Sequence, residues 1–245
     1  MTEILLCGLT VFLSFTLEVI TGFGGTVMAV SFVTALLGMH KGVVVLTLVA
    51  IIPQLSVVIR NFRKIDWRNY LIIVALMLPF LFVGRLLQST VDTAVLKRIL
   101  ACFIIAVSVF RLVQFFVSRK KDGSEEPSQV RWYSYLALVG AGIIHGMFSS
   151  GGPLAIIYTS SAVKEKDSFR STMCLLWITL NIILVVSYLA DGSITADTGR
   201  TVLCLIPFLA AGIIAGNIIV SRVNEKIFSL VVYICLLATG IFMLL

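Results

Sequence analysis

Long apolar runs separated by short polar breaks extend along the whole chain. The runs cover approximately residues 4–20, 26–39, 42–59, 69–90, 95–117, 133–148, 153–163, 171–189, 201–220 and 227–245. A membrane-spanning helix needs about 20 mostly apolar residues and satisfies its backbone hydrogen bonds internally. The alternating strands that a transmembrane barrel requires are not what these runs predict. The pattern therefore predicts an all-α, polytopic integral membrane protein.

Composition and charge support this prediction. Hydrophobic residues make up 59% of the chain and charged residues 13%, against about 25% charged in a typical soluble domain. The net charge is +7, but the basic residues form short clusters between apolar runs and no basic face interleaved with aromatic residues. We therefore expect the lipid bilayer, and no nucleic acid, as a partner. The five cysteines lie in separate runs without metal-ligand spacing, so no metal and no cofactor are expected.

The chain reads as a fused duplication. The polar segment 118–131 is the one convincing linker, and it lies near the midpoint. Residues 1–117 and 132–245 are therefore interpreted as two transmembrane repeats of about five helical segments each, joined by a cytoplasmic linker. Four pairs of residues are related by the same offset of 127. They are Glu18 and His145, Gly24 and Gly151, Gly25 and Gly152, and Gln54 and Asn181.

The distribution of Lys and Arg predicts the orientation, because cytoplasmic loops carry the excess. If each half crosses the membrane an odd number of times, 13 of these residues lie on the cytoplasmic side and 5 on the other. If each half crosses four times, the split is nine to nine. The first alternative predicts inverted repeats with both termini extracytoplasmic. The first two runs of each half are short, and either re-entrant segments or two tilted spans fit them.

Glycine-rich breaks interrupt the helices at equivalent places in the two halves, as in many secondary transporters. The first break has the sequence TGFGGT from Thr21 and the second SSGGP from Ser149. Backbone amides and hydroxyls at helix starts form an anion site, and we expect one here. The predicted substrate-binding residues at the breaks are Gly22, Gly24, Gly25, Thr26, Ser149, Ser150, Gly151 and Gly152. The alternative is close helix packing by small residues, which suits Gly212 and Gly216 better than a binding role.

Glu18 and His145 precede the two breaks inside apolar runs. Ionisable groups within a membrane are costly and point to function, so these two are candidates for proton coupling. Alternatively, Glu18 reaches water at a helix end, or the two residues pair with each other. Gln54 and Asn181 are either further substrate ligands or interhelical hydrogen-bond partners. Arg85 is interpreted as extending to the outer surface.

The segments TGFGGTVMAV and SGGPLAI resemble the paired glycine-rich motifs of the TauE/SafE sulfite exporter family. The resemblance covers essentially the whole chain. It implies an all-helical permease of the bacterial inner membrane that moves small anions such as sulfite, thiosulfate, sulfoacetate or other organosulfonates. This chain lacks a proline after the first Gly-Gly pair and has Ser149 and Ser150 where the family often has a glycine.

The function predicted is secondary transport of small anions by alternating access, with proton coupling as an option. An anion channel is the main alternative, because broken helices can also line a pore. An intramembrane enzyme is less favoured, since the chain has no HExxH or GxSxG motif and His145 and Ser150 are too close in sequence for the usual dyad. A homodimer is left open.

Overall fold

The computed structural model describes residues 2–21, 25–118 and 130–219, together with 230, 233, 234, 236–238, 240, 241 and 244. Over these residues the chain is helical and contains no strand. The helices are α1 (Thr2–Thr21), α2 (Gly25–Leu37), α3 (Met39–Asn61), α4 (Trp67–Thr90), α5 (Thr93–Ser118), α6 (Trp132–Phe148), α7 (Gly152–Ala162), α8 (Lys166–Ala190) and α9 (Ala196–Ile219), with a short 3-10 turn, η1 (Phe62–Lys64). These bounds follow the apolar runs closely, but most of the last predicted run lies outside the described residues.

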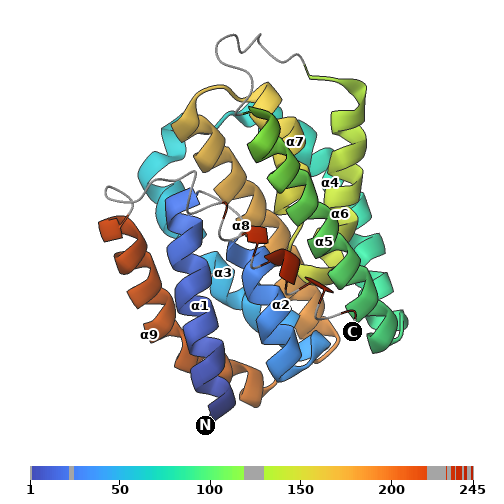
Figure 1. Cartoon of the computed structure of the whole chain (residues 1–245), viewed down its shortest axis with the longest axis vertical. Helices are drawn as coiled ribbons and strands as arrows, with labels where there is room; N and C mark the ends of the chain where they lie inside the picture. Colours follow the sequence, from blue (N-terminus) through green and yellow to red (C-terminus); the bar gives the residue numbers. More distant parts are fainter. Residues whose placement is uncertain are drawn as a thin grey trace.

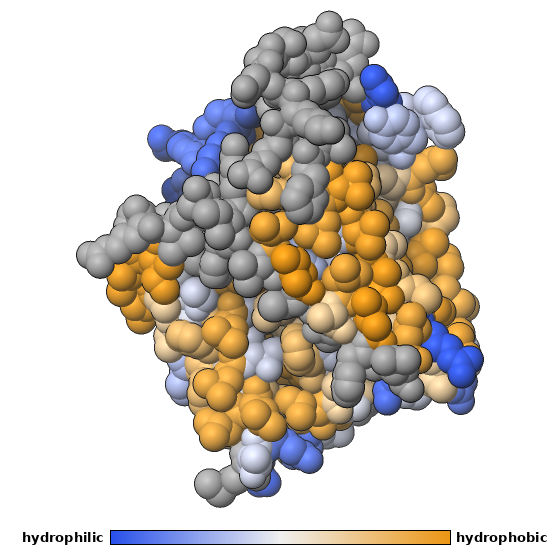
Figure 2. Space-filling model, in the orientation of Figure 1, coloured by the Kyte–Doolittle hydropathy of each residue, from blue (hydrophilic) through white to orange (hydrophobic). Residues whose placement is uncertain are grey.

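Six of the described helices are long and apolar enough to cross a membrane, namely α1, α3, α4, α5, α8 and α9. This confirms the prediction of a polytopic membrane protein. Figure 2 shows a broad hydrophobic band across the face in view, with hydrophilic residues gathered toward its two ends. Large apolar side chains such as Leu86 and Ile214 lie on the outside, where a soluble protein would carry polar groups.

Helices α1 and α2 form one hairpin, and α6 and α7 form another. At about 1.5 Å per residue, the 13 residues of α2 and the 11 of α7 reach only about 20 and 17 Å, short of the roughly 30 Å hydrocarbon core. Each hairpin therefore enters with a longer helix and turns back with a short one. Helix α1 begins at the lower end of the molecule and α6 at the upper end, so the hairpins enter from opposite ends (Figure 1).

The hairpins are held by helices from the other half of the chain. Helix α1 packs along α9, α6 packs along α4, and α3 and α8 pack against each other between them. A Cβ atom on Gly212 would lie 2.6 Å from the carbonyl oxygen of Phe12, and one on Gly216 would lie 2.9 Å from that of Thr16. The packing interpretation of these two glycines is confirmed. Gly84 makes an equally close approach between α4 and α6.

Candidate functional site

The first break lies between the end of α1 and the start of α2 at Gly25. Gly22 and Gly24 lie outside the described residues. A Cβ on Gly25 would overlap the carbonyl oxygen of Ser14 and lie 2.7 Å from a carboxylate oxygen of Glu18. Helix α2 can therefore begin this close to α1 only because Gly25 has no side chain. One residue later, the Thr26 hydroxyl donates a hydrogen bond to Glu18 Oε2 at 3.2 Å.

The second break is built in the same way. Ser149 ends α6 in a left-handed conformation, with φ of 52°, and its amide donates to the His145 carbonyl at 2.7 Å. A Cβ on Gly151 would overlap the Ala141 carbonyl oxygen and lie 2.9 Å from the Cβ of His145. Gly151 is thus the structural counterpart of Gly25, a shift of one residue from the pairing expected from the sequence. A Cβ on Gly152 would meet nothing closer than Trp177, at 3.8 Å.

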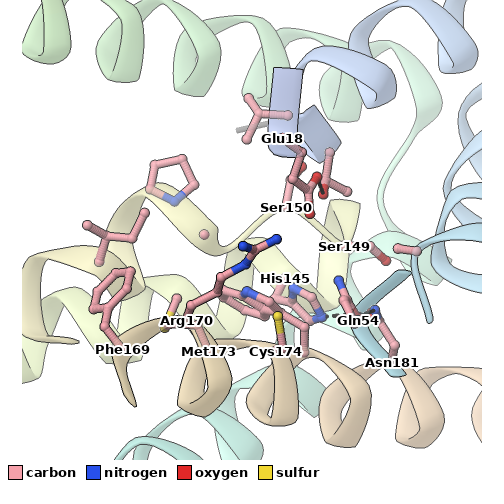
Figure 3. Close-up of a pocket in the computed structure, with 17 residues that line it drawn as sticks. Glu18, Gln54, His145, Ser149, Ser150, Phe169, Arg170, Met173, Cys174 and Asn181 are labelled. Atoms are coloured by element: carbon pink, nitrogen blue, oxygen red, sulfur yellow. Dashed lines mark hydrogen bonds between the residues drawn. The ribbon is translucent and has the colours of Figure 1, made fainter. Parts of the chain in front are cut away.

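The two breaks meet around a central cavity of about 50 Å³ (Figure 3). Most of the predicted site residues line it. They are Glu18, Thr26, Gln54, His145, Ser149, Ser150, Gly152 and Asn181. Gly25 and Gly151 instead lie behind the cavity wall, where they allow each short helix to approach its partner. The structure therefore brings together residues more than 100 positions apart in sequence, although it does not test their role in binding.

A chain of hydrogen bonds fixes the polar groups on one wall of the cavity. The Asn181 amide donates to Gln54 Oε1 at 3.4 Å, and the Asn181 oxygen lies 3.1 Å from His145 Nε2. The Gly151 amide approaches His145 Nδ1 at 3.5 Å. These bonds are compatible with one tautomer, a neutral imidazole whose Nε2–H donates and whose Nδ1 accepts. Gln54 and Asn181 therefore serve as interhelical partners and also face the cavity.

Glu18 and His145 make separate contacts. Glu18 bonds to Thr26, whereas His145 bonds to Asn181 and stacks on Trp177, with ring centroids 5.1 Å apart and planes at 24°. The described ion pairs do not include one between Glu18 and His145. Of the alternatives raised by the sequence, a Glu18–His145 pair is therefore not what the described contacts show.

One hydrogen-bond donor without a described partner faces the same space. The Ser150 hydroxyl is buried and has no hydrogen-bond partner among the described residues. Thr26 and Gly152, in the first turns of α2 and α7, both line the cavity. Amides in a helix's first turn lack intrahelical acceptors and carry the positive end of the helix dipole. The cavity thus offers the Ser150 hydroxyl and the start of α7 to an anion, whereas the start of α2 already faces the Glu18 carboxylate, which accepts from Thr26.

Arg170 is the functional candidate that the sequence analysis missed, because it had been counted only as a cytoplasmic loop residue. It lines the central cavity, and Figure 3 shows its guanidinium pointing from α8 toward Glu18 and Ser150. Cys174 and Trp177 line the cavity from the same face of α8. A helical spacing of four, three and four residues links Arg170 through these two to Asn181. Following that face back from Asn181 would have identified Arg170.

Arg85 does not extend to the surface as expected. Its side chain is buried near the lower end of the molecule, where it forms an ion pair with Asp191. Nη1 donates to Gln88 Oε1 at 2.8 Å, Nε donates to the Ser187 hydroxyl at 3.3 Å, and the guanidinium lies 4.5 Å from the ring centroid of Tyr188. The outer-surface interpretation was therefore wrong, because α8 supplies polar partners within the protein.

Partial burial acts to raise the pKa of Asp191, but hydrogen bonds from Ser193 and the adjoining guanidinium of Arg85 outweigh it and hold the pKa below its usual range. The ion pair is therefore charged at neutral pH. Within the described ranges, no three His, Cys, Asp or Glu side chains come together as metal ligands would.

A family model described as sulfite exporter TauE/SafE matches residues 7–243, nearly the whole chain. The chain belongs to the sulfite exporter TauE/SafE family. The family resemblance drawn from the two glycine-rich segments is thereby confirmed. Neither the curated proteins nor the solved structures that were searched contain a match.

Membership of the TauE/SafE family identifies the chain as a membrane transporter. It also agrees with the expectation that the protein is not an enzyme. The six helices capable of crossing a membrane fit the same conclusion.

Proposed function

We propose that this TauE/SafE protein is a secondary transporter of small anions, with sulfur oxyanions such as sulfite as the leading substrate class, and that the central cavity is its binding site. The observation that carries the proposal is the buried Ser150 hydroxyl, which has no described partner and lies between the starts of two short helices. A carrier for an anion needs donors that the anion satisfies, and helix starts supply them.

The size of the cavity favours a small substrate. A space of about 10 to 15 Å³ is enough for one water molecule, so about 50 Å³ accommodates roughly three to five. An oxyanion with four or five non-hydrogen atoms, such as sulfite or sulfate, is of that size. Sulfoacetate and other organosulfonates would require the cavity to widen.

Glu18 is the stronger candidate for proton coupling. It is the one carboxylate that lines the central cavity in the described chain, and an anion beside it would be repelled unless a proton were bound. His145 is held in a neutral form whose two nitrogens are already bonded, so protonation would break its contact with Gly151. We therefore assign His145 to positioning Asn181 and the second break.

Alternating access follows from two hairpins that enter from opposite ends and meet at one site. In this proposal the halves are inverted repeats, the end with Arg170 faces the cytoplasm, and both termini are outside the cell in the bacterial inner membrane. A channel remains the second candidate, but the Arg85–Asp191 cluster, which lies beyond the cavity at the other end, favours a carrier.

Counterflow in reconstituted vesicles tests this proposal. Labelled sulfite should accumulate transiently in vesicles preloaded with unlabelled sulfite, which a pore cannot achieve. Ser150→Ala should weaken apparent affinity by about tenfold, because a hydrogen bond to a charged ligand contributes about 1.5 to 3 kcal/mol. Ser160→Ala is the control, since Ser160 is an exposed residue of α7, the helix that follows Ser150, and its hydroxyl donates to the Ile156 carbonyl. Absence of counterflow alongside anion conductance would contradict a carrier.

A further inference from the structure

A second hollow, of about 230 Å³, lies next to the central cavity on the side of Arg170. It is bounded by residues of α1, α3, α8 and α9. Four residues line both spaces, namely Glu18, Gln54, Arg170 and Cys174. We call this hollow the vestibule, because an ion leaving the central cavity past Arg170 enters it.

Two arginines from neighbouring helices line the vestibule. Helices α3 and α8 pack side by side, and their register is given by Gln54 with Asn181 and by Lys64 with Asp167. Between those contacts the register places Arg60, one turn before Lys64, level with Arg170, near the start of α8. Both arginines therefore line one hollow, where like charges repel each other.

Glu18 is the one described carboxylate that lines this hollow with the two arginines, and its charge interacts with that of Arg170. Neither arginine makes an ion pair or hydrogen bond with any residue that the structure describes. Asp167, near the start of α8, is bonded to Lys64. One carboxylate does not balance two guanidinium groups, and an anion beside Glu18 requires that its carboxyl carry a proton, as in the central cavity. An anion between the two guanidinium groups would offset their repulsion, and Asn217 lines the same hollow with an amide donor.

We propose that the vestibule is a second anion site, which takes a small doubly charged oxyanion on Arg60 and Arg170. The inference rests on the proposed function, because Arg170 faces both spaces and can contact the transported ion in either. The central cavity holds the ion through a hydroxyl and the start of α7. The vestibule holds it through two full positive charges, which suits capture from the aqueous phase.

The test is sulfate binding to the purified full-length protein in phospholipid-free detergent, with Trp67 and Trp132 replaced by Phe. Trp177 is then the remaining tryptophan and reports on the central cavity. Calorimetry should count two sulfate ions per chain, one of which quenches Trp177. Arg60→Gln, which alters the vestibule alone, should weaken the non-quenching equivalent at least tenfold and leave the quenching constant within twofold. Arg63→Gln removes the same charge from the exposed η1 turn and should change neither.

Each alternative outcome has a distinct meaning. One equivalent in the unsubstituted protein, or equal effects of Arg60→Gln and Arg63→Gln, would overturn the vestibule site. Two equivalents without Trp177 quenching would count against the central site of the proposed function instead. Loss of the second equivalent on adding phosphatidylglycerol would assign the vestibule to a lipid phosphate and overturn its assignment to a dissolved anion.

Discussion

The two ends of α8 hold their cations differently. Near its start, Arg170 lines two connected hollows and forms no described ion pair, although it shares both hollows with Glu18. Near its end, Arg85 of α4 is enclosed by Asp191, Ser187 and Tyr188 and is only 9% exposed. A buried cation that is enclosed by its partners fills the space between the helices and binds no further anion. A cation that borders a hollow and has no ion-pair partner can bind an anion there. Under the proposed function, this difference predicts that the central cavity opens toward the Arg170 end and that the cluster of Arg85, Gln88, Ser187, Tyr188 and Asp191 closes the other end; we call this cluster the seal.

The seal is coupled to the second break through tight backbone packing. Gly84 precedes Arg85, and a Cβ there would overlap the carbonyl oxygen of Ile143 in α6. His145 and the second break follow within one turn. Movement of α4 relative to α6 would therefore disturb both the ion pair and the wall of the central cavity.

The largest effect is expected from breaking the seal. Arg85→Leu leaves Asp191 and Gln88 without their shared partner, and loss of one member of a largely buried pair costs up to several kcal/mol. We expect counterflow to fall about 100-fold, with a measurable anion leak in vesicles. Arg98→Leu, at an exposed position of α5, is the matched control. Equal behaviour of the two variants would mean that the Arg85 cluster is not a gate.

At the Arg170 end of α8, the expected effect of a substitution is on anion binding. Arg170→Gln removes the cation from both hollows, and a charge-assisted contact of about 1.5 to 2 kcal/mol corresponds to about 10- to 30-fold weaker sulfate binding. Lys166→Gln, one turn earlier on α8, should shift binding by less than about twofold because Lys166 lines neither hollow. Trp177 quenching measures both. An unchanged constant for Arg170→Gln would remove this residue from the site.

Packing under the seal can be tested with a pair of glycines. Gly84→Ala forces a methyl group into the α6 backbone and should destabilise the protein by about 1 to 3 kcal/mol. Gly140→Ala meets only the flexible end of Leu154, at 3.4 Å, and should stay within about 0.5 kcal/mol of the parent protein. Thermal unfolding in detergent gives the comparison, and equal midpoints would show that α4 and α6 can separate cheaply.

The smallest effect is the pH response of the seal. Since the pKa of Asp191 is lowered in the folded protein, its contribution to stability is complete above the ordinary aspartate pKa of about 3.9 and is lost as the pH falls through the lower folded value. Asp191→Asn should therefore flatten the fall in unfolding temperature below about pH 4. Asp92→Asn, at the exposed start of α5, should keep the parent slope. A parent-like slope in Asp191→Asn would show that the ion pair contributes little.

The helices could be predicted from the sequence because each membrane-spanning helix needs a continuous run of apolar residues, which is a local property of the sequence. Each long helix is a run of apolar residues, and each break contains glycine, so bounds such as 67–90 for α4 match the run at 69–90 closely. The convergence of Glu18, Ser150 and Asn181 on one cavity also agrees with the internal repeat.

The remaining features depend on contacts between distant segments. Apart from its helical spacing from Asn181, nothing in the sequence distinguishes Arg170 from its loop neighbours, because the hollow that it lines is formed by α1 and α3 opposite it. Arg85 was misinterpreted for the same reason, since Asp191 lies 106 positions away. The one-residue shift from Gly152 to Gly151 could be seen only where α7 meets α6.

The exchange of helices between the halves has a consequence for biosynthesis. Helix α1 packs mainly against α9, which begins at residue 196. Helix α4 packs mainly against α6, which is also made later than α4. Most of the chain must therefore leave the ribosome before the first helix reaches its final surroundings. Until then, the small-residue faces meant for close helix contact lie against lipid. Helix packing in the bilayer is therefore expected to be completed cooperatively, only after α9 has been synthesised. A chain truncated before α9 should be degraded and should not accumulate as a stable fragment.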